Sequence, residues 1–445
     1  MRPFGIILSI MVCYVFLENR KFSDIYIKIL ALTMCVEVFI NLGYFIKISS
    51  FELQYSELLI GILGLLSLIQ IIRSKVNKKL FLLGCFLLSS VIISNILLII
   101  APYDNPIITF GIGWDNYFTG NLASAKFSFQ TIKMSFRITL YILITIASVS
   151  LMTENYVREI TSRFIRFGLL VMSFAAIEFI LKNIFQSNAL KIINSWFFGV
   201  GDWTVEVLLE RSSTFALQGF MREPAHFASA MFAFGLVLIF SSKEMKSSKK
   251  LLAVSIVMFL SRSFAAVIYL VVLFGIYAVV NNKKLVYSIS AMLLVPLVAI
   301  TNNFSYYIER LGNIIQLFAA SEVNRTMSEH VRIISVVENL KIFSERPFFG
   351  IGIGTTYAHG FIPTLLASAG ILGFALWFSL MFIGVAKMKR NMNNFIIIFL
   401  LLMCWTFTGS IANAYSMSLL LLVLIIRYDQ SYTIYRLGVK NANGN

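Results

Sequence analysis

The chain of 445 residues is too apolar for a soluble protein, because 58% of its residues are hydrophobic and only 13% are charged; soluble domains carry about 25% charged residues. Apolar stretches long enough to cross about 30 Å of hydrocarbon recur from end to end and leave no room for a separate soluble domain. The net charge of +16 would suggest nucleic acid as the partner of a soluble protein, but here it fits the cationic cytoplasmic loops of a membrane protein. We therefore expect one integral membrane domain over residues 1–445, all-α, because lipid offers backbone groups no partner.

The predicted spans follow one another along the chain. They lie at about 4–17, 25–46, 57–72, 80–101, 133–152, 164–182, 224–242, 251–280, 285–301, 360–386, 394–410 and 412–427. The four cysteines lie inside these stretches without pairing or metal-like spacing, which predicts buried free thiols.

The stretch 251–280 is expected to form two helices rather than one. It is longer than a single span needs, and the basic clusters at its two ends, 243–250 and 281–284, both belong in the cytoplasm. A hairpin that turns at Ser261-Arg262-Ser263 satisfies both conditions. With it, the bundle has about 12–13 spans, the N-terminus outside and the C-terminus inside.

Three long connections then fall on the outer face: 102–132, 183–223 and 302–359. All three histidines lie in or beside them. In the second connection two arginines, Arg211 and Arg222, flank a stretch of small residues, and Glu223-Pro224 opens the next helix. Glu-Pro at a helix start is often only a cap, and arginines near spans often anchor to lipid headgroups, so these alternatives stay open.

The third connection contains a predicted amphipathic helix that lies along the membrane surface. Five apolar residues recur at helical spacing before Pro347, which ends the helix: Val331, Ile334, Val337, Leu340 and Ile342. Arg332 lies in the first turns of this helix, and three glycines follow the proline. Glycines permit turns that other residues resist, so the loop can bring amide N–H groups close to an anion.

Arg262 is expected at the hairpin turn, at the outer face or within the membrane. An arginine deep in a bilayer costs about 2.5–3.5 kcal/mol on insertion scales, so it faces a polar cavity or, alternatively, snorkels to the interface. Lys28, Glu37 and Glu178 also lie in spans, and we expect Glu178 to pair with one of the arginines.

The outer side is therefore rich in arginine and histidine but lacks clustered carboxylates. Guanidinium groups bind phosphate oxygens in a bidentate fashion and keep their charge. The sequence contains no D-x-D pair, no closely spaced His/Glu set for Mg²⁺ or Zn²⁺, and no Walker motif. This pattern predicts a substrate that carries phosphate and is held without a metal or another cofactor.

Four short motifs stand in a fixed order along these segments. They are an R…EP segment from Arg211 to Pro224, the S-R-S turn at 261–263, an arginine fifteen residues before a P-x-x-G-x-G-x-G stretch (Arg332 and 347–354), and a histidine eleven residues before a G-x-x-G helix start (His359, Gly370 and Gly373). In this order and spacing they resemble the O-antigen polymerase and ligase superfamily, the Wzy-type polymerases and WaaL-type ligases, over about 205–375.

The chain departs from the family pattern in two places. The family histidine is often followed by asparagine, whereas His359 is followed by Gly360. The gap before Glu223-Pro224 is also longer than usual, so either Arg211 or Arg222 matches the family arginine.

The resemblance implies a GT-C-type membrane glycosyltransferase. Such enzymes transfer a glycan from undecaprenyl pyrophosphate to an acceptor hydroxyl on the outer face of the bacterial inner membrane. It implies catalytic roles for Glu223, Arg262, Arg332 and His359, and substrate binding by Arg211, Arg222, Arg325, Gly350, Gly352 and Gly354. The arginines would neutralise the leaving pyrophosphate, and His359, or alternatively Glu223, would accept the acceptor's proton.

Polymerase is the favoured activity, with lipid-linked glycans as donor and acceptor, and with a chain-length regulator and a flippase as possible protein partners. A ligase that transfers the glycan to lipid A core or another acceptor is the alternative within the family. A flippase or other transporter would show paired repeats with broken helices, and the sequence contains no convincing duplication.

Overall fold

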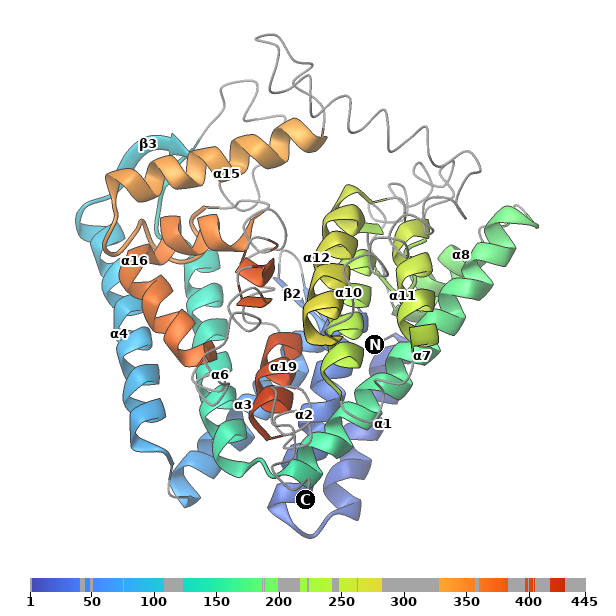
Figure 1. Ribbon diagram of the computed structural model, residues 1–445. Helices are drawn as coiled ribbons and strands as arrows, with labels where there is room; N and C mark the ends of the chain where they lie inside the picture. The colour runs from blue at the N-terminus through green and yellow to red at the C-terminus, as the bar shows by residue number, and fades with distance from the viewer. Residues whose placement is uncertain are drawn as a thin grey trace, which may run out of the picture.

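The computed structural model describes residues 2–40, 45–48, 51–74, 76–107, 123–185, 187, 189–198, 217–221, 224–241, 248–261, 263–281, 328–356, 360–382, 397–398, 400–402, 404 and 417–428. The described part of the chain is mostly helical, as predicted (Figure 1). The predicted span at 285–301 and most of the one at 394–410 lie outside it.

The first half of the chain forms long helices joined in two places by short antiparallel strand pairs. The helices are α1 (Pro3–Glu18), α2 (Phe22–Phe39), α3 (Tyr55–Arg73), α4 (Lys78–Ile100), α6 (Phe129–Leu151) and α7 (Glu154–Asn183). Between α2 and α3, β1 (Ile46–Ile48) pairs with β2 (Phe51–Leu53), and Ile46 lies opposite Leu53. Between α4 and α6, β3 (Tyr103–Ile107) pairs with β4 (Ala123–Ala125) around a bulge.

The second half adds shorter helices and one that crosses the others. They are α8 (Ala189–Phe198), α10 (Pro224–Phe240), α11 (Ser248–Leu260), α12 (Phe264–Asn281), α15 (Ser328–Glu345), α16 (Phe361–Phe382) and α19 (Met417–Tyr428). In Figure 1, α15 lies across the upper end of the molecule, above α16 and beside β3, while α4 and α6 descend beneath it. Helix α16 packs against both α15 and α4, and α10 packs against α11 and α12.

Local sequence explains where several helices begin. The Asn77 side chain accepts the backbone amides of Lys79 and Leu80 at 3.0 and 3.3 Å and caps α4. Gln54 and Glu57 form a reciprocal capping box at the start of α3. Pro224 stands at the first position of α10, where its missing N–H is no loss.

Within the described residues, five helices are long and apolar enough to cross a membrane: Tyr55–Arg73, Lys78–Ile100, Phe129–Leu151, Glu154–Lys182 and Phe361–Leu380. Shorter apolar helices occupy Pro3–Glu18, Pro224–Phe240 and Ala265–Val280. Large apolar side chains such as Ile72, Phe86 and Ile99 are exposed on the outer sides of these helices. A surface of this kind suggests a membrane protein, because lipid rather than water would cover it.

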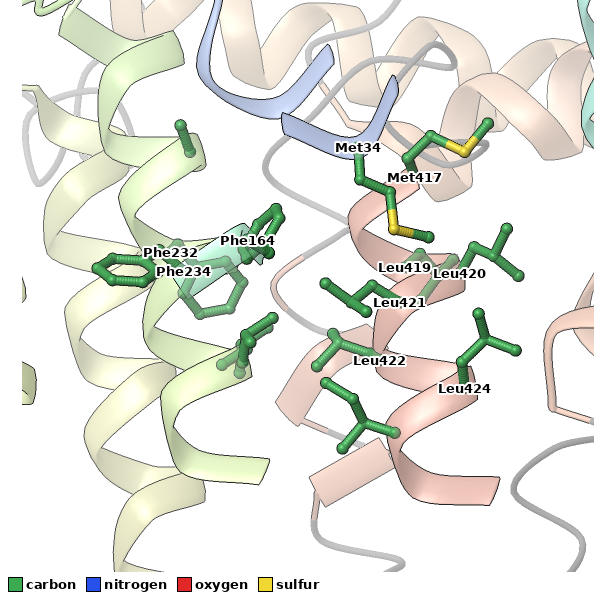
Figure 2. Close-up of a cluster of buried hydrophobic side chains, with 14 of the residues drawn as sticks. Met34, Phe164, Phe232, Phe234, Met417, Leu419, Leu420, Leu421, Leu422 and Leu424 are labelled. Atoms are coloured by element: carbon green, nitrogen blue, oxygen red, sulfur yellow. The ribbon is translucent and has the colours of Figure 1, made fainter. Parts of the chain in front are cut away.

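The largest cluster of buried hydrophobic side chains among the described residues reaches from α2 to α19, and two smaller clusters lie beside it. Figure 2 shows the leucines of α19 and the phenylalanines of α10 in this cluster, with Met34 of α2 nearby. The rings of Phe164 on α7 and Phe234 on α10 lie 6.5 Å apart between their centroids. This packing joins helices from both halves of the chain.

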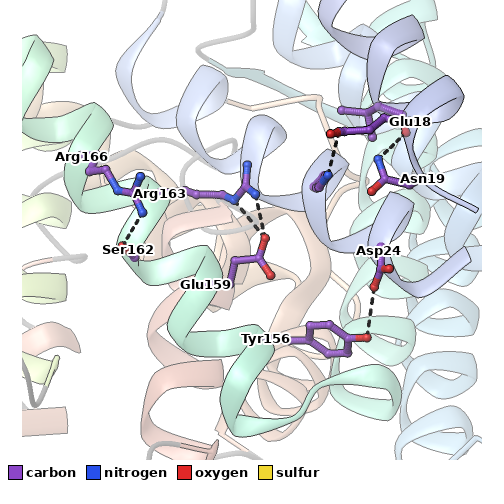
Figure 3. Close-up of polar contacts among 10 residues, drawn as sticks. Glu18, Asn19, Asp24, Tyr156, Glu159, Ser162, Arg163 and Arg166 are labelled. Carbon is purple, nitrogen blue, oxygen red and sulfur yellow. Dashed lines mark hydrogen bonds and ion pairs between the residues drawn. The ribbon is translucent and has the colours of Figure 1, made fainter. Parts of the chain in front are cut away.

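The expected hairpin is confirmed, because α11 ends at Leu260 and α12 begins at Phe264. Two predicted boundaries are wrong. The predicted span 25–46 ends at Phe39, where Ile40 already has an extended backbone, and Ile46 belongs to β1. Helix α7 begins at Glu154 rather than 164, because i,i+4 pairs such as Glu159–Arg163 stabilise a polar extension that hydropathy does not detect (Figure 3).

The prediction that the four cysteines are buried is half right. Cys35 and Cys404 are buried, whereas Cys13 and Cys85 are exposed. The exposed pair lies on α1 and α4, two helices with many exposed apolar side chains. Apolar surroundings in the sequence therefore did not distinguish a helix face inside the bundle from one on its outside.

Candidate functional site

The structure describes part of the predicted site. Gly350, Gly352 and Gly354 are described in full, and the backbone of Arg332 lies in the second turn of α15. The other predicted site residues lie outside the described part of the chain: Arg211, Arg222, Glu223, Arg262, Arg325 and His359. What the structure adds for these residues is the position of the segments that flank them.

The predicted amphipathic helix is α15, and it ends two residues before Pro347, as expected. Two of the apolar residues on which the prediction rests, Val337 and Leu340, are 55% and 42% exposed. The side of the helix that is buried in the protein carries Ser335, Asn339 and Ile342.

The three glycines form the turns that the sequence predicted. Gly350, Gly352 and Gly354 have φ angles of +66°, +95° and +81°, which residues with a Cβ adopt at a cost. A Cβ on Gly350 would overlap the carbonyl oxygen of Ala367, so close approach as well as backbone angle requires glycine here.

This glycine loop (347–356) packs into a break in α16. Gly370, with φ +66° and ψ −172°, interrupts the helix, and a Cβ there would overlap the carbonyl oxygen of Phe348. On one side of the break the amide of Ile351 donates to the carbonyl of Ala367 at 2.9 Å. On the other side the amide of Ile371 donates to the carbonyl of Pro347 at 2.8 Å. The loop and the two halves of α16 therefore satisfy each other's free backbone groups.

Helix α4 also binds the glycine loop and α16. The hydroxyl of Ser94 donates to the carbonyl of Ser368 at 2.7 Å and accepts the amide of Gly352 at 3.0 Å. The neighbouring Asn95 side chain accepts the amide of Ile353 at 3.1 Å. The amides of Ile351, Gly352 and Ile353 thus already donate to protein acceptors, so in this conformation the glycines serve packing rather than an open anion cradle.

The glycine loop is also joined to α15. Thr356 Oγ1 donates to the side chain of Asn339 at 3.1 Å, and both residues are fully buried. Thr356 is three residues before His359, and Asn339 is two turns after Arg332 on α15. Gly360, directly after His359, accepts the amide of Thr364 in the first turn of α16. The helix that carries Arg332 and the segments on both sides of His359 therefore belong to one packed unit.

The other end of α15 is held by β3. The Tyr103 hydroxyl donates to the Glu345 carboxylate, and Asn105 Nδ2 donates to the same oxygen at 3.2 Å. Burial, followed by this hydrogen bond to Glu345, raises the pKa of Tyr103 above its usual value. Tyr103 therefore stays protonated, and the contact that fixes the end of α15 persists across the physiological pH range.

A second group of described segments flanks Arg222, Glu223 and Arg262 in the chain. The amide of Leu217 donates to the carbonyl of Leu260 at 3.2 Å, so the segment 217–221 lies against the end of α11. This segment leads directly into Arg222-Glu223, and Leu260 is two residues before Arg262. The structure thus brings together the flanks of two motifs that are about forty residues apart in the chain.

The sequence did not predict the partners of two charged groups, one buried around Glu178 and one partly buried around Glu37. Glu178 pairs with Lys182 one turn along α7, not with an arginine as expected. Glu37 accepts from Arg137 at 3.3 Å and from the amide of Met417 at 2.7 Å, and Tyr141 also donates to it. The available signal was spacing: Glu178 and Lys182, like Arg137 and Tyr141, stand at i,i+4 in apolar surroundings.

Comparison with known proteins adds no assignment to this geometry. No protein-family model matches the chain, and no curated protein matches it.

Proposed function

We propose that this protein is a polysaccharide polymerase of the O-antigen polymerase and ligase superfamily, with a GT-C-type fold. It joins oligosaccharide repeat units carried on undecaprenyl pyrophosphate into O-antigen, capsule or exopolysaccharide. It is a multi-pass protein of the bacterial inner membrane, and its reaction takes place on the face outside the cytoplasm. Its substrates are lipid-linked glycans, and it works without a metal.

The observation that carries the proposal is the packed unit of α15, the glycine loop and α16. The Asn339–Thr356 hydrogen bond of 3.1 Å and the locked break at Gly370 hold the helix of Arg332 and both flanks of His359 together. The arginine, the glycine-proline stretch and the histidine are the motifs on which the family resemblance rests. A rigid support for a cation and a proton acceptor suits the transfer of a group away from a diphosphate.

The reaction follows from these roles. The hydroxyl oxygen of the acceptor sugar forms a bond to the anomeric carbon of the donor glycan, and the bond from that carbon to the pyrophosphate oxygen breaks. The electron pair leaves with undecaprenyl pyrophosphate, and the hydroxyl proton goes to His359 or, alternatively, Glu223. Arg332, Arg262 and Arg222 or Arg211 stabilise the charge that develops on the leaving pyrophosphate.

The test in cells uses a strain whose copy of this gene is deleted. Plasmids carrying wild type, Arg332→Ala, Arg262→Ala or His359→Ala are compared for long-chain polysaccharide on a gel at matched protein levels. We expect a ladder from wild type and single repeat units from the three variants. Arg332→Lys, which keeps the charge but loses the bidentate geometry, should give shortened or sparse ladders.

Lys341→Ala is the matched control, because Lys341 is an exposed cation further along the same helix as Arg332. It should give the wild-type ladder. Wild-type ladders from all three site variants would refute the assignment. Long chains that form in the deletion strain but stay on the lipid carrier would instead identify the ligase activity.

A further inference from the structure

A buried carboxylate on α7 holds the segment 217–221. Glu178 and Lys182 are 4% and 7% exposed and form an ion pair. The second carboxylate oxygen of Glu178 accepts the backbone amides of Gln218 at 3.2 Å and Gly219 at 2.8 Å. One side chain therefore binds two consecutive amides of a segment that is about forty residues away in sequence.

The same segment is held at other points. Asn194 Nδ2 on α8 donates to the carbonyl of Gly219 at 3.3 Å, and the amide of Leu217 donates to Leu260 on α11. Gly219 has φ +56°, and a Cβ there would lie 2.8 Å from the ring of Phe227 on α10. Helices α7, α8, α10 and α11 thus fix this short turn from four directions.

Stability alone is a poor explanation for this arrangement. Replacing a buried ion pair by apolar residues of similar volume is often neutral or stabilising, since both charges lose their hydration. A charge within an apolar helix is costly and usually marks a functional region. What the carboxylate achieves here is to hold an irregular backbone turn, because it accepts amides that would otherwise be buried without partners.

The turn is connected to two of the predicted site segments. Arg222 and Glu223 directly follow Met221 in the chain. The Leu217–Leu260 hydrogen bond joins the turn to the end of α11, two residues before Arg262 in the chain. We propose that Glu178 is a positioning residue: by binding the amides of Gln218 and Gly219 it fixes the turn that leads directly into Arg222 and Glu223, the residues proposed to act on the substrate pyrophosphate. This proposal rests on the proposed function for the identity of the substrate. Lys182 balances the charge of Glu178 in the apolar surroundings.

The first test measures the turn itself and does not depend on activity. Hydrogen exchange of a peptide covering 217–221 is followed by mass spectrometry in purified wild type, Glu178→Gln and Glu178→Ala. We expect exchange in Glu178→Ala to be at least about tenfold faster than in wild type, because two amides lose their acceptor. Glu178→Gln, whose side-chain oxygen still accepts, should lie between the two.

The matched control is Glu159→Ala. Glu159 stands on the same helix and also pairs at i,i+4, with Arg163 at 2.7 Å, but this pair is exposed, and within the described residues Glu159 accepts hydrogen bonds from Arg163 alone. In Glu159→Ala, hydrogen exchange of the segment 217–221 should be as slow as in wild type. Unchanged exchange in both Glu178 variants would overturn the proposal, and Glu178→Gln carries the test if the alanine variant does not fold.

The second test measures transfer by purified protein with an undecaprenyl-pyrophosphate-linked repeat unit. Glu178→Ala should lower kcat by about 10–100-fold while KM changes much less, since misplaced arginines lose contacts made in the transition state. Glu178→Gln should recover part of kcat, and Glu159→Ala should match wild type. A wild-type kcat in a Glu178 variant whose amide hydrogens in 217–221 exchange faster than in wild type would refute the positioning role of Glu178. Absence of transfer by wild type would instead refute the proposed function and leave the exchange result standing.

Discussion

Gly350 in the glycine loop and Gly370 in α16 each lie where an added Cβ would overlap the backbone of the other segment. Gly350 lies against the carbonyls of Ala367 and Ser368, and Gly370 lies against the backbone of Phe348. Both have φ of +66°, so a side chain at either position would meet backbone strain as well as an atom that cannot move aside. The pair explains why the glycine loop and the break in α16 fit together.

Replacing Gly370 by alanine should therefore destabilise the protein strongly. The backbone angle alone costs about 1–3 kcal/mol for a residue with a Cβ, and the overlap with Phe348 adds to it. We expect a lower apparent melting temperature in detergent, and reduced polymer in cells.

Gly61 provides the control for this substitution. It lies inside α3, and a Cβ there would meet nothing within 4 Å. Gly61→Ala should keep or slightly raise the melting temperature, because alanine favours a helix over glycine by about 0.5–1 kcal/mol. Equal melting temperatures for the two variants would contradict the proposed contact.

At the scale of elements, the sequence predicted the helices better than their connections. The basic clusters around 251–280 identified the α11–α12 hairpin, and Pro347 marked the end of α15. The strand pairs β1–β2 and β3–β4 and the helix α8 were missed, because each is short and lies in a segment interpreted as a loop. Their pairing depends on contacts between segments, which hydropathy along one segment cannot reveal.

The partners of charged residues inside the bundle also come from other elements, so the sequence did not reveal them. Glu37 was recognised as an acid within a span, but its partners come from α6 and the start of α19. The Met417 amide that it binds is 380 residues away in sequence. Glu37 therefore joins three helices, α2, α6 and α19, at one buried point.

We expect a double-mutant cycle to show strong coupling at this point. Glu37→Leu or Arg137→Leu alone should cost about 3–5 kcal/mol of unfolding free energy, because each leaves one buried charge without its partner. The double variant should cost less than the sum of the two, because no lone charge remains.

Unfolding by denaturant in detergent micelles measures all four proteins of the cycle. The exposed Glu154–Arg158 pair on α7 is the control, since exposed pairs contribute about 0–1 kcal/mol. Additive costs at Glu37 and Arg137 would contradict a stabilising ion pair between α2 and α6.

At the scale of the molecule, two packed units support the candidate site. One is α15 with the glycine loop and α16, and the other is the turn 217–221 with α7, α8 and α11. In Figure 1, α15 extends across the upper end of the molecule from β3 towards the side of α10 and α12. The hydrophobic cluster that contains Met221 also contains Ile353, so one continuous core supports both units.

The sequence predicted the segments of the candidate site but not the residues that hold these segments. The order of arginine, proline and glycines along the chain was enough to mark the helix of Arg332 and the glycine loop. Ser94 and Asn95, which bind the loop, are 258 residues away in sequence and lie in an apolar helix with no motif. Only the folded arrangement identifies such supporting residues.

The most direct test of the account is transfer by the purified protein in liposomes that contain an undecaprenyl-pyrophosphate-linked repeat unit and EDTA. Wild type should lengthen the glycan and release one undecaprenyl pyrophosphate for each bond formed. Arg332→Ala and Arg262→Ala should each lower kcat by about 100–1,000-fold, the usual cost of losing a group that stabilises developing charge. Folded wild-type protein that forms no glycosidic bond, or arginine variants that turn over at the wild-type rate, would contradict the account.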